Sequence, residues 1–214
     1  MSDCSHRILA SSMPKQIRRI TLKPRKYPAQ PRSADTVAII LEAAARILER
    51  RGLAGYNTNA VAELAGVSIG SLYQYFPNKD ALVAALVERE TAVLLDELSD
   101  IPDEVSFVVG MRHMIRAAIA HQMRRPALAR LLDFEEQRLP LGPRNEKVGQ
   151  TIANIVVSLL GRPGAPRTAN KAVAALDVLA IVKGMVDAAG QRGEMDSIAL
   201  QRRVERAVEG YLGS

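Results

Sequence analysis

The spacing of apolar residues along the chain predicts a protein made of helices. Between residues 33 and 52 the apolar positions recur every three or four residues, which places them on one face of a helix. Two short helices, at about 59–65 and 69–75, and a longer one at about 79–98 follow. Later helices are expected at about 107–125, 127–138, 147–160, 168–189 and 197–212. No segment alternates in the manner of a strand, so the predicted fold class is all-α, with about nine helices.

Asparagine, glycine and proline mark the helix ends before residue 80. Gly52 can end the first helix in a left-handed conformation, and Asn57 and Asn78 are predicted N-caps. Gly66 supplies the left-handed backbone that a tight turn needs, and Pro77 ends the second short helix. Two short helices joined by the turn sequence AGVS form a helix-turn-helix, whose second helix can enter a DNA major groove about 12 Å wide.

The second short helix and its flanks carry hydroxyl groups and no negative charge. No Asp or Glu occurs from residue 65 to residue 78, where an acidic side chain would repel a nucleic acid. Lys79, in the first turn of the next helix, adds a positive charge to free backbone N–H groups, which suits a phosphate. Phe76 is expected in the core. Hydroxyls that can hydrogen-bond phosphate oxygens belong to Ser68, Ser71, Tyr73 and Tyr75.

The same helix limits which bases can be read. No Lys or Arg lies from residue 67 to residue 75, so the common pairing of a basic side chain with guanine is not available from it. Gln74 can hydrogen-bond adenine, and Ile69 can contact a thymine methyl group. The DNA site is therefore expected to include A·T pairs, with further specificity from DNA shape or from the basic N-terminal segment.

Positive charge is concentrated at the start of the chain. Residues 1–32 contain eight Lys or Arg and one Asp, whereas the whole 214-residue chain has a formal net charge of +6. This Pro-containing extension is interpreted either as an arm that contacts a polyanion or as a solvated segment. The single cysteine excludes an intrachain disulfide, and no apolar run is long enough to span a membrane. A cytoplasmic protein without a membrane partner is expected.

Two adjoining segments carry a family resemblance. Residues 66–82, GVSIGSLYQYFPNKDAL, and residues 40–65, ILEAAARILERRGLAGYNTNAVAELA, resemble the TetR (tetracycline-repressor-like) family of bacterial transcriptional regulators. The resemblance implies a helix-turn-helix domain at 33–80, following the extension at 1–32, and a helical ligand-binding and dimerisation domain at 81–214. It also implies the partners: a palindromic double-stranded DNA operator, a second copy bound through the last two helices, and an unidentified small-molecule effector.

The resemblance gives roles to individual residues. The chain departs from the family at Ala60, where an acidic residue that completes a capping box is frequent. Ile69 stands where Lys, Arg or Pro is frequent, which removes a possible basic contact. The implied phosphate contacts are Thr58, Tyr73, Tyr75 and Lys79, and the implied base contacts are Asn59, Ser68, Ile69, Gly70, Ser71 and Gln74.

The sequence of the C-terminal region gives less specific indications. Methionine and aromatic residues at helical spacing can line a ligand pocket or can be plain core. Leu200, Val204 and Val208 form an apolar stripe that suits a four-helix dimer interface or the internal core of one subunit. The pocket candidates are Phe107, Met111, Met114, His121, Phe134, Leu159 and Met185.

The sequence gives little support for a metal site or for an enzyme active site. His113 and His121 could meet Asp133 or Glu136 at a metal, but no close ligand pair such as HxxxH occurs, so no metal or cofactor is expected. No nucleophile motif or Gly-rich phosphate loop marks an enzyme. The first hypothesis is a ligand-responsive DNA-binding transcriptional regulator, most simply a homodimeric repressor. The alternative is a helical ligand-binding or interaction protein with a vestigial helix-turn-helix.

Overall fold

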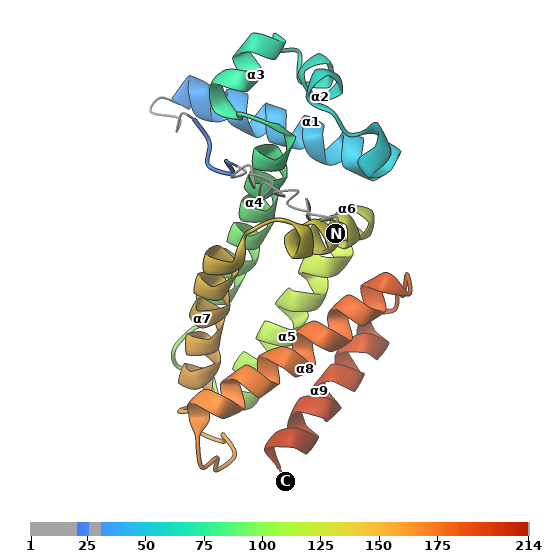
Figure 1. The fold of residues 1–214 in the computed structure, drawn as a ribbon. Coiled ribbons are helices and arrows are strands. Elements are labelled where there is room, and N and C mark those ends of the chain that lie inside the picture. Colours follow the sequence, from blue (N-terminus) through green and yellow to red (C-terminus); the bar gives the residue numbers. More distant parts are fainter. Residues whose placement is uncertain (1–20, 26–30, 214) are drawn as a thin grey trace, which may run out of the picture.

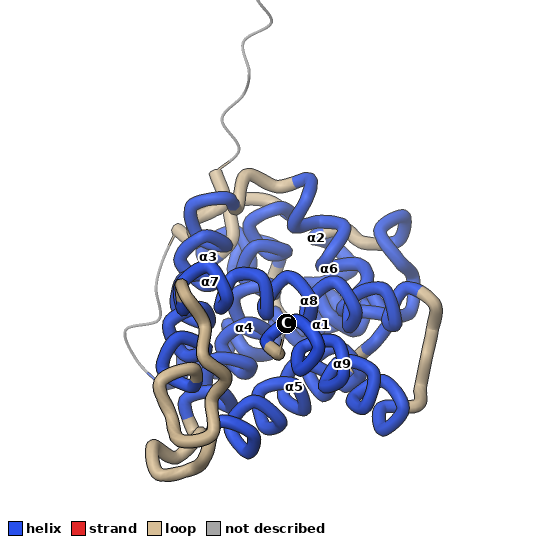
Figure 2. The backbone as a smooth tube through the Cα atoms, turned by 90° about the horizontal axis from the view of Figure 1, so that it is seen from below, coloured by secondary structure: helices blue, strands red, loops and turns tan. Residues whose placement is uncertain are grey.

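The computed structural model describes residues 21–25 and 31–213, and within this part of the chain all regular elements are helices. The prediction of an all-α fold is confirmed (Figures 1 and 2). Most of the predicted basic extension, residues 1–20 and 26–30, lies outside the described residues. The helices are α1 (Pro31–Gly55), α2 (Thr58–Ala65), α3 (Ile69–Tyr75), α4 (Lys79–Ser99), α5 (Phe107–Arg124), α6 (Pro126–Arg138), α7 (Gly142–Leu159), α8 (Lys171–Gln191) and α9 (Ser197–Leu212).

The helices form two groups joined by α4. Figure 1 shows α1, α2 and α3 together at one end, with α4 running from them into the larger group formed by α5 to α9. The core of the smaller group contains Leu48, Leu72 and Phe76, but it also contains Leu82 of α4 and Leu128 of α6. Helix α6 therefore packs against the DNA-binding end across the expected domain boundary at residue 80.

The larger group has a second core, built by α5, α7, α8, α9 and the end of α4. Gly110 allows α5 to lie close to α7, because a Cβ atom at this position would come within 2.4 Å of Leu159 Cδ2. Leu200, Val204 and Val208 of α9 are buried in this core. The apolar stripe of α9 is thus internal to the subunit, which confirms the second of the two predicted alternatives, the core of one subunit.

Several helix boundaries differ from the sequence-based prediction; α8, for example, begins at Lys171 after the N-cap Asn170 rather than at residue 168. Gly52 has φ 61°, so the regular α1 helix is interrupted where a stop was predicted, but the chain resumes a further turn to Gly55. Helix α7 begins at Gly142 rather than near residue 147, because Pro143 occupies the first turn, where a missing N–H costs nothing. No helix in the described ranges is long and apolar enough to cross a membrane.

Candidate nucleic-acid interface

Three capping residues define the two ends of α2 and the start of α3. Asn57 caps α2 by accepting a hydrogen bond from the Ala60 N–H at 2.9 Å, and Gly66 ends α2 with a left-handed φ of 67°. Ser68 then caps α3 through a 3.0 Å bond from the Ser71 N–H to its Oγ. The predicted roles of Asn57 and Gly66 are confirmed. Because both helices are short, these caps fix the angle at which α3 leaves the turn.

Helix α3 is anchored on one face and open on the other. Leu72 is fully buried and Phe76, at the end of the helix, is 1% exposed, which confirms the prediction that Phe76 belongs to the core. On the opposite face Ile69 is 38% exposed, Tyr73 is 39% exposed, and Gln74 is also exposed. The residues predicted to meet DNA therefore project from a helix that is held by its apolar side.

The four expected phosphate-contacting residues lie around the ends of this unit. The hydroxyl groups of Thr58 and Tyr73 are 3.1 Å apart, so α2 and α3 bring them together on one surface. Lys79 is exposed in the first turn of α4, whose N-cap Asn78 accepts a 2.8 Å bond from the Ala81 N–H. Tyr75 is half-buried and packs against the first core. Its ring is therefore less available to solvent than that of Tyr73.

The six expected base-contacting residues are mostly exposed. Ser71 is half-buried and its hydroxyl lies 2.8 Å from that of Ser68, so the two serines are already engaged with each other at the start of α3. Gly70 has open space around it, with Ser68 Oγ 3.8 Å from where a Cβ would lie. The exposed members of the set are Asn59, Ser68, Ile69, Gly70 and Gln74.

Tyr56 is a positioning residue that the sequence reading missed. Its side chain is buried, and its hydroxyl donates a 3.2 Å hydrogen bond to the backbone carbonyl of Lys79. Burial, reinforced by the charges of Asp80 and Glu135, raises the pKa of Tyr56, so the hydroxyl remains a donor. The sequence did contain a signal for this role, because Tyr56 directly precedes the N-cap Asn57, where the first residue of a hydrophobic staple stands.

A short piece of the N-terminal extension lies against the helix-turn-helix. The N–H of Arg25 donates to the Tyr75 carbonyl at 2.8 Å, and Asn78 Nδ2 donates to the Thr21 carbonyl at 3.0 Å. Leu22 packs on the first core, while the side chains of Lys23 and Arg25 are exposed. Residues 21–25 thus place positive charge beside the end of α3 and the start of α4.

The larger group of helices forms a partly open cavity of about 320 Å³ between α4, α5, α6, α7 and α8. Of the seven candidates for a ligand pocket, Met114 and His121 line it. Phe107 and Met111 line a separate cavity of about 260 Å³ beside α9. Leu159 is fully buried in the second core, Met185 packs against that core, and Phe134 is 58% exposed on α6. Apolar periodicity alone does not distinguish these environments.

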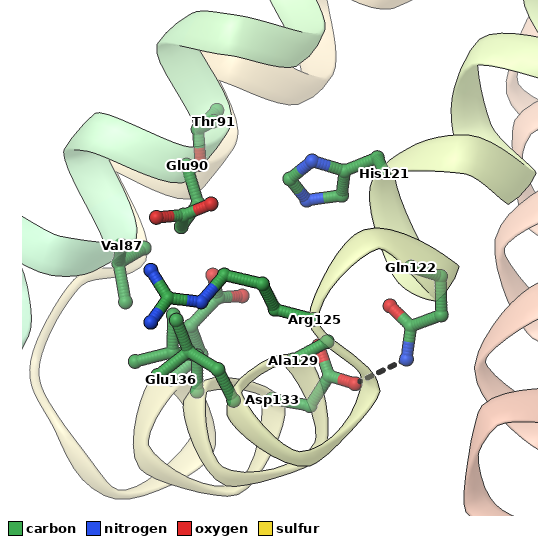
Figure 3. Close-up of a pocket in the computed structure, with 11 residues that line it drawn as sticks. Val87, Glu90, Thr91, His121, Gln122, Arg125, Ala129, Asp133 and Glu136 are labelled. Atoms are coloured by element: carbon green, nitrogen blue, oxygen red, sulfur yellow. Dashed lines mark hydrogen bonds between the residues drawn. The ribbon is translucent and has the colours of Figure 1, made fainter. Parts of the chain in front are cut away.

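The cavity adjoins a junction that ties α6 to α1. Arg125, between α5 and α6, bonds Glu49 through Nε at 2.7 Å and Nη2 at 2.5 Å, and bonds Glu42 through Nη1 at 2.9 Å. A third, smaller cavity of about 40 Å³ is lined by Arg125 (Figure 3). It shares Asp133 and Glu136 with the cavity of about 320 Å³. Helix α6 therefore lines the cavity and, through Arg125 at its start, is also ion-paired to α1.

A helix-turn-helix unit with an exposed second helix, joined to a helical domain that holds a cavity, defines a class of protein that places its second helix in a DNA major groove. The profile described as bacterial regulatory proteins, tetR family, matches residues 40–86. The profile described as tetracyclin repressor-like, C-terminal domain, matches residues 108–212. Together these matches cover more than half of the chain, and the protein belongs to the tetR family of bacterial regulatory proteins.

Individual relatives match parts of the chain. The HTH-type transcriptional regulator TtgR of Pseudomonas putida is 41% identical over 83 residues, which are 38% of this chain and 40% of that protein. The uncharacterised HTH-type transcriptional regulator Rv1255c of Mycobacterium tuberculosis is 32% identical over 126 residues, 58% of this chain and 61% of that protein. The match thus spans less than two thirds of either relative.

A solved structure shares the fold over a longer span. The transcriptional regulator FadR from Bacillus subtilis, in complex with stearoyl-CoA, superposes with a TM-score of 0.69 over 80% of this chain and 96% of that chain. The sequence identity is 17%, so the likeness concerns the fold alone.

Proposed function

We propose that this protein is a cytoplasmic transcriptional regulator, most simply a repressor, that binds a palindromic DNA operator as a homodimer and releases it when an effector binds. The observation that carries the proposal is the exposed, acid-free face of α3, which is held by Leu72 and Phe76 and flanked by the hydroxyls of Thr58 and Tyr73. Phosphate contacts from this rim would set the register, and Gln74 would read a base.

The proposed dimer uses the outer faces of α8 and α9. Val173 is 50% exposed, Leu176 is 56% exposed and Ile198 is 64% exposed, although all three are large and apolar. The exposed small residues Ala180 and Gly184 continue the α8 face, and a Cβ atom at Gly184 would meet no atom within 4 Å. Such a face suits close packing of α8 against the same helix of a second copy.

The proposed coupling runs from the cavity through Arg125 to α1. Asp133 and Glu136, on α6, line both cavities, and Arg125 lines the smaller one (Figure 3). A ligand that displaces α6 changes the position of Arg125, and with it the carboxylates of Glu42 and Glu49. Because α1 packs on α2, this movement changes the spacing of the two α3 helices in a dimer.

The salt dependence of duplex binding tests the proposal. For the wild type, log Kd should change steeply with log salt concentration, by about 0.9 for each phosphate contacted. Lys79→Ala and Tyr73→Phe should weaken binding to operator and random duplex alike, because phosphate contacts carry no sequence information. Lys147→Ala, which removes an exposed lysine on α7, is the matched control and should bind as the wild type does.

Two results would contradict the proposal. Binding that is weak and insensitive to salt would favour a vestigial helix-turn-helix. Unchanged affinities for Lys79→Ala and Tyr73→Phe would remove these two residues from the interface.

A further inference from the structure

The larger cavity has an apolar wall and an acidic side. Its carboxylates come from Asp133 and Glu136 of α6 and from Asp187 of α8, whereas Lys183 is the one Lys or Arg among its lining residues. No Phe, Tyr or Trp is present among the residues described as lining it. The apolar part of the wall consists of aliphatic and methionine side chains, among them Leu94, Leu98, Met114, Ile152, Val182 and Val186.

The cationic side chains near these carboxylates are bound elsewhere. Lys183 Nζ lies 2.7 Å from Asp187 Oδ2, which pairs the lysine with the carboxylate of its own helix. Arg144 Nη2 lies 2.5 Å from Glu88 Oε2, and Arg125 is held by Glu42 and Glu49. Every one of these cations thus has an anionic partner other than the α6 carboxylates.

Neither Asp133 nor Glu136 is in an ion pair within the described residues, although the ammonium group of Lys183, paired with Asp187, acts on both carboxylates at longer range. Asp133 Oδ2 accepts a hydrogen bond from the neutral amide of Gln122 at 3.3 Å (Figure 3). Within the described part of the chain, Glu136 makes no hydrogen bond or ion pair. Three residues apart on α6, the two carboxyls lie on the same face of the helix. Burial raises the pKa of both, and the nearby carboxylate of Asp187 adds to the rise, while the charge of Lys183 opposes it without cancelling it.

His121 adds an unfilled polar position to the same space. It lines both cavities, and its Nδ1 atom is buried with no hydrogen-bond partner among the described residues. Burial lowers the pKa of His121, so the imidazole is neutral at physiological pH and does not repel a cation. Unpaired buried polar atoms are uncommon in native structures, and a bound water or ion is one of the explanations for them.

We propose that the effector is an amphipathic cation, with an apolar body against α5, α7 and α8 and an ammonium or amidinium group between Asp133 and Glu136. The proposal rests on the proposed function only in naming this ligand an effector. The three carboxylates Asp133, Glu136 and Asp187 face a single Lys183 in this cavity, so a positive group reduces the excess of negative charge, whereas a carboxylate ligand adds to it. Because both carboxylates lie on α6, the ligand acts on the helix that carries Arg125 at its start.

Three probes of equal length separate charge from hydrophobicity: n-octylammonium, n-octanol and n-octanoate, each titrated calorimetrically into the full chain at neutral pH. The ammonium should bind at least about tenfold more tightly than the alcohol, and octanoate should bind most weakly. Glu136→Gln should weaken binding of the ammonium about tenfold or more and leave the alcohol unchanged within about twofold. Glu104→Gln, which removes an exposed carboxylate outside the cavity, is the matched control and should leave all three affinities unchanged.

A second variant and a second readout separate ligand loss from misfolding. Asp133→Asn should show the same selective loss as Glu136→Gln. Both variants should melt at the wild-type temperature or above it when free of ligand, since each removes a half-buried charge that is in no ion pair. The idea fails if the alcohol or octanoate binds as tightly as the ammonium, if no probe binds, or if neither substitution changes the preference.

The same probes distinguish this inference from the proposed function. If octylammonium binds at Asp133 and Glu136 but leaves affinity for operator DNA unchanged, the cation site stands and the effector role fails. If octanoate rather than octylammonium releases DNA, the regulatory function stands and the cationic class is wrong.

Discussion

Leu176→Asp is expected to convert the protein to single 23.3 kDa chains and to abolish binding to operator DNA at concentrations where the wild type is saturated. A two-fold axis places both new carboxylates in the same interface, and an uncompensated charge in such a place costs about 3–5 kcal/mol. Since about 1.4 kcal/mol is tenfold, the dimerisation constant should fall by at least about a hundredfold. Sedimentation velocity and a DNA-binding titration on the same samples measure both effects.

The matched control for this change is Val93→Asp. Val93 is also an apolar residue at a partly open position, 36% exposed, but it lies on α4 and outside the proposed interface. It should remain a dimer and retain operator binding. A Leu176→Asp protein that is still dimeric would place the interface elsewhere than on the outer face of α8.

Phe76→Ala is expected to have the largest effect on stability. Its ring is 1% exposed and lies in the first core with Leu48 and Leu72. Removing a buried phenylalanine ring costs about 3–5 kcal/mol, from lost burial and the cavity left behind. Urea denaturation followed by circular dichroism should therefore show a much lower free energy of unfolding, and DNA binding should weaken because α3 loses its anchor.

Tyr73→Phe is the matched aromatic control. The hydroxyl that it removes belongs to a 39% exposed side chain, so the free energy of unfolding should change by no more than about 0.5 kcal/mol. DNA binding should nevertheless weaken. If Phe76→Ala unfolded at nearly the wild-type urea concentration, the ring would not hold the helix-turn-helix together.

Local chemistry allowed the DNA-binding end to be predicted from the sequence. The caps Asn57 and Asn78 and the left-handed Gly66 act within three or four residues, so the helix boundaries at these three residues could be inferred from a short window. Helix α7 shows the limit of that approach. The prediction left residues 139–146, which include Gly142 and Pro143, between two helices, although proline is equally suited to the first turn of a helix.

The cavity and its link to α1 depend on contacts between distant residues, so no local pattern announces them. Arg125 and Glu42 are 83 residues apart in the chain, and Tyr56 and Lys79 are 23 apart. Methionine and leucine follow the same helical spacing whether they line a cavity, as Met114 does, or fill a core, as Leu159 does. Leu159 can pack in the core because Gly110, which has no side chain, leaves room for it.

Selection from a randomised duplex library, run in parallel on the wild type and on Gln74→Ala, tests the central claim that α3 reads DNA. The wild type should select a palindrome with A·T pairs at defined positions of each half-site. Gln74→Ala should lose preference at one base pair in each half-site, at a cost of about 1–3 kcal/mol, while binding random duplex as the wild type does. Identical motifs from the two proteins, or no motif from the wild type, would contradict the account.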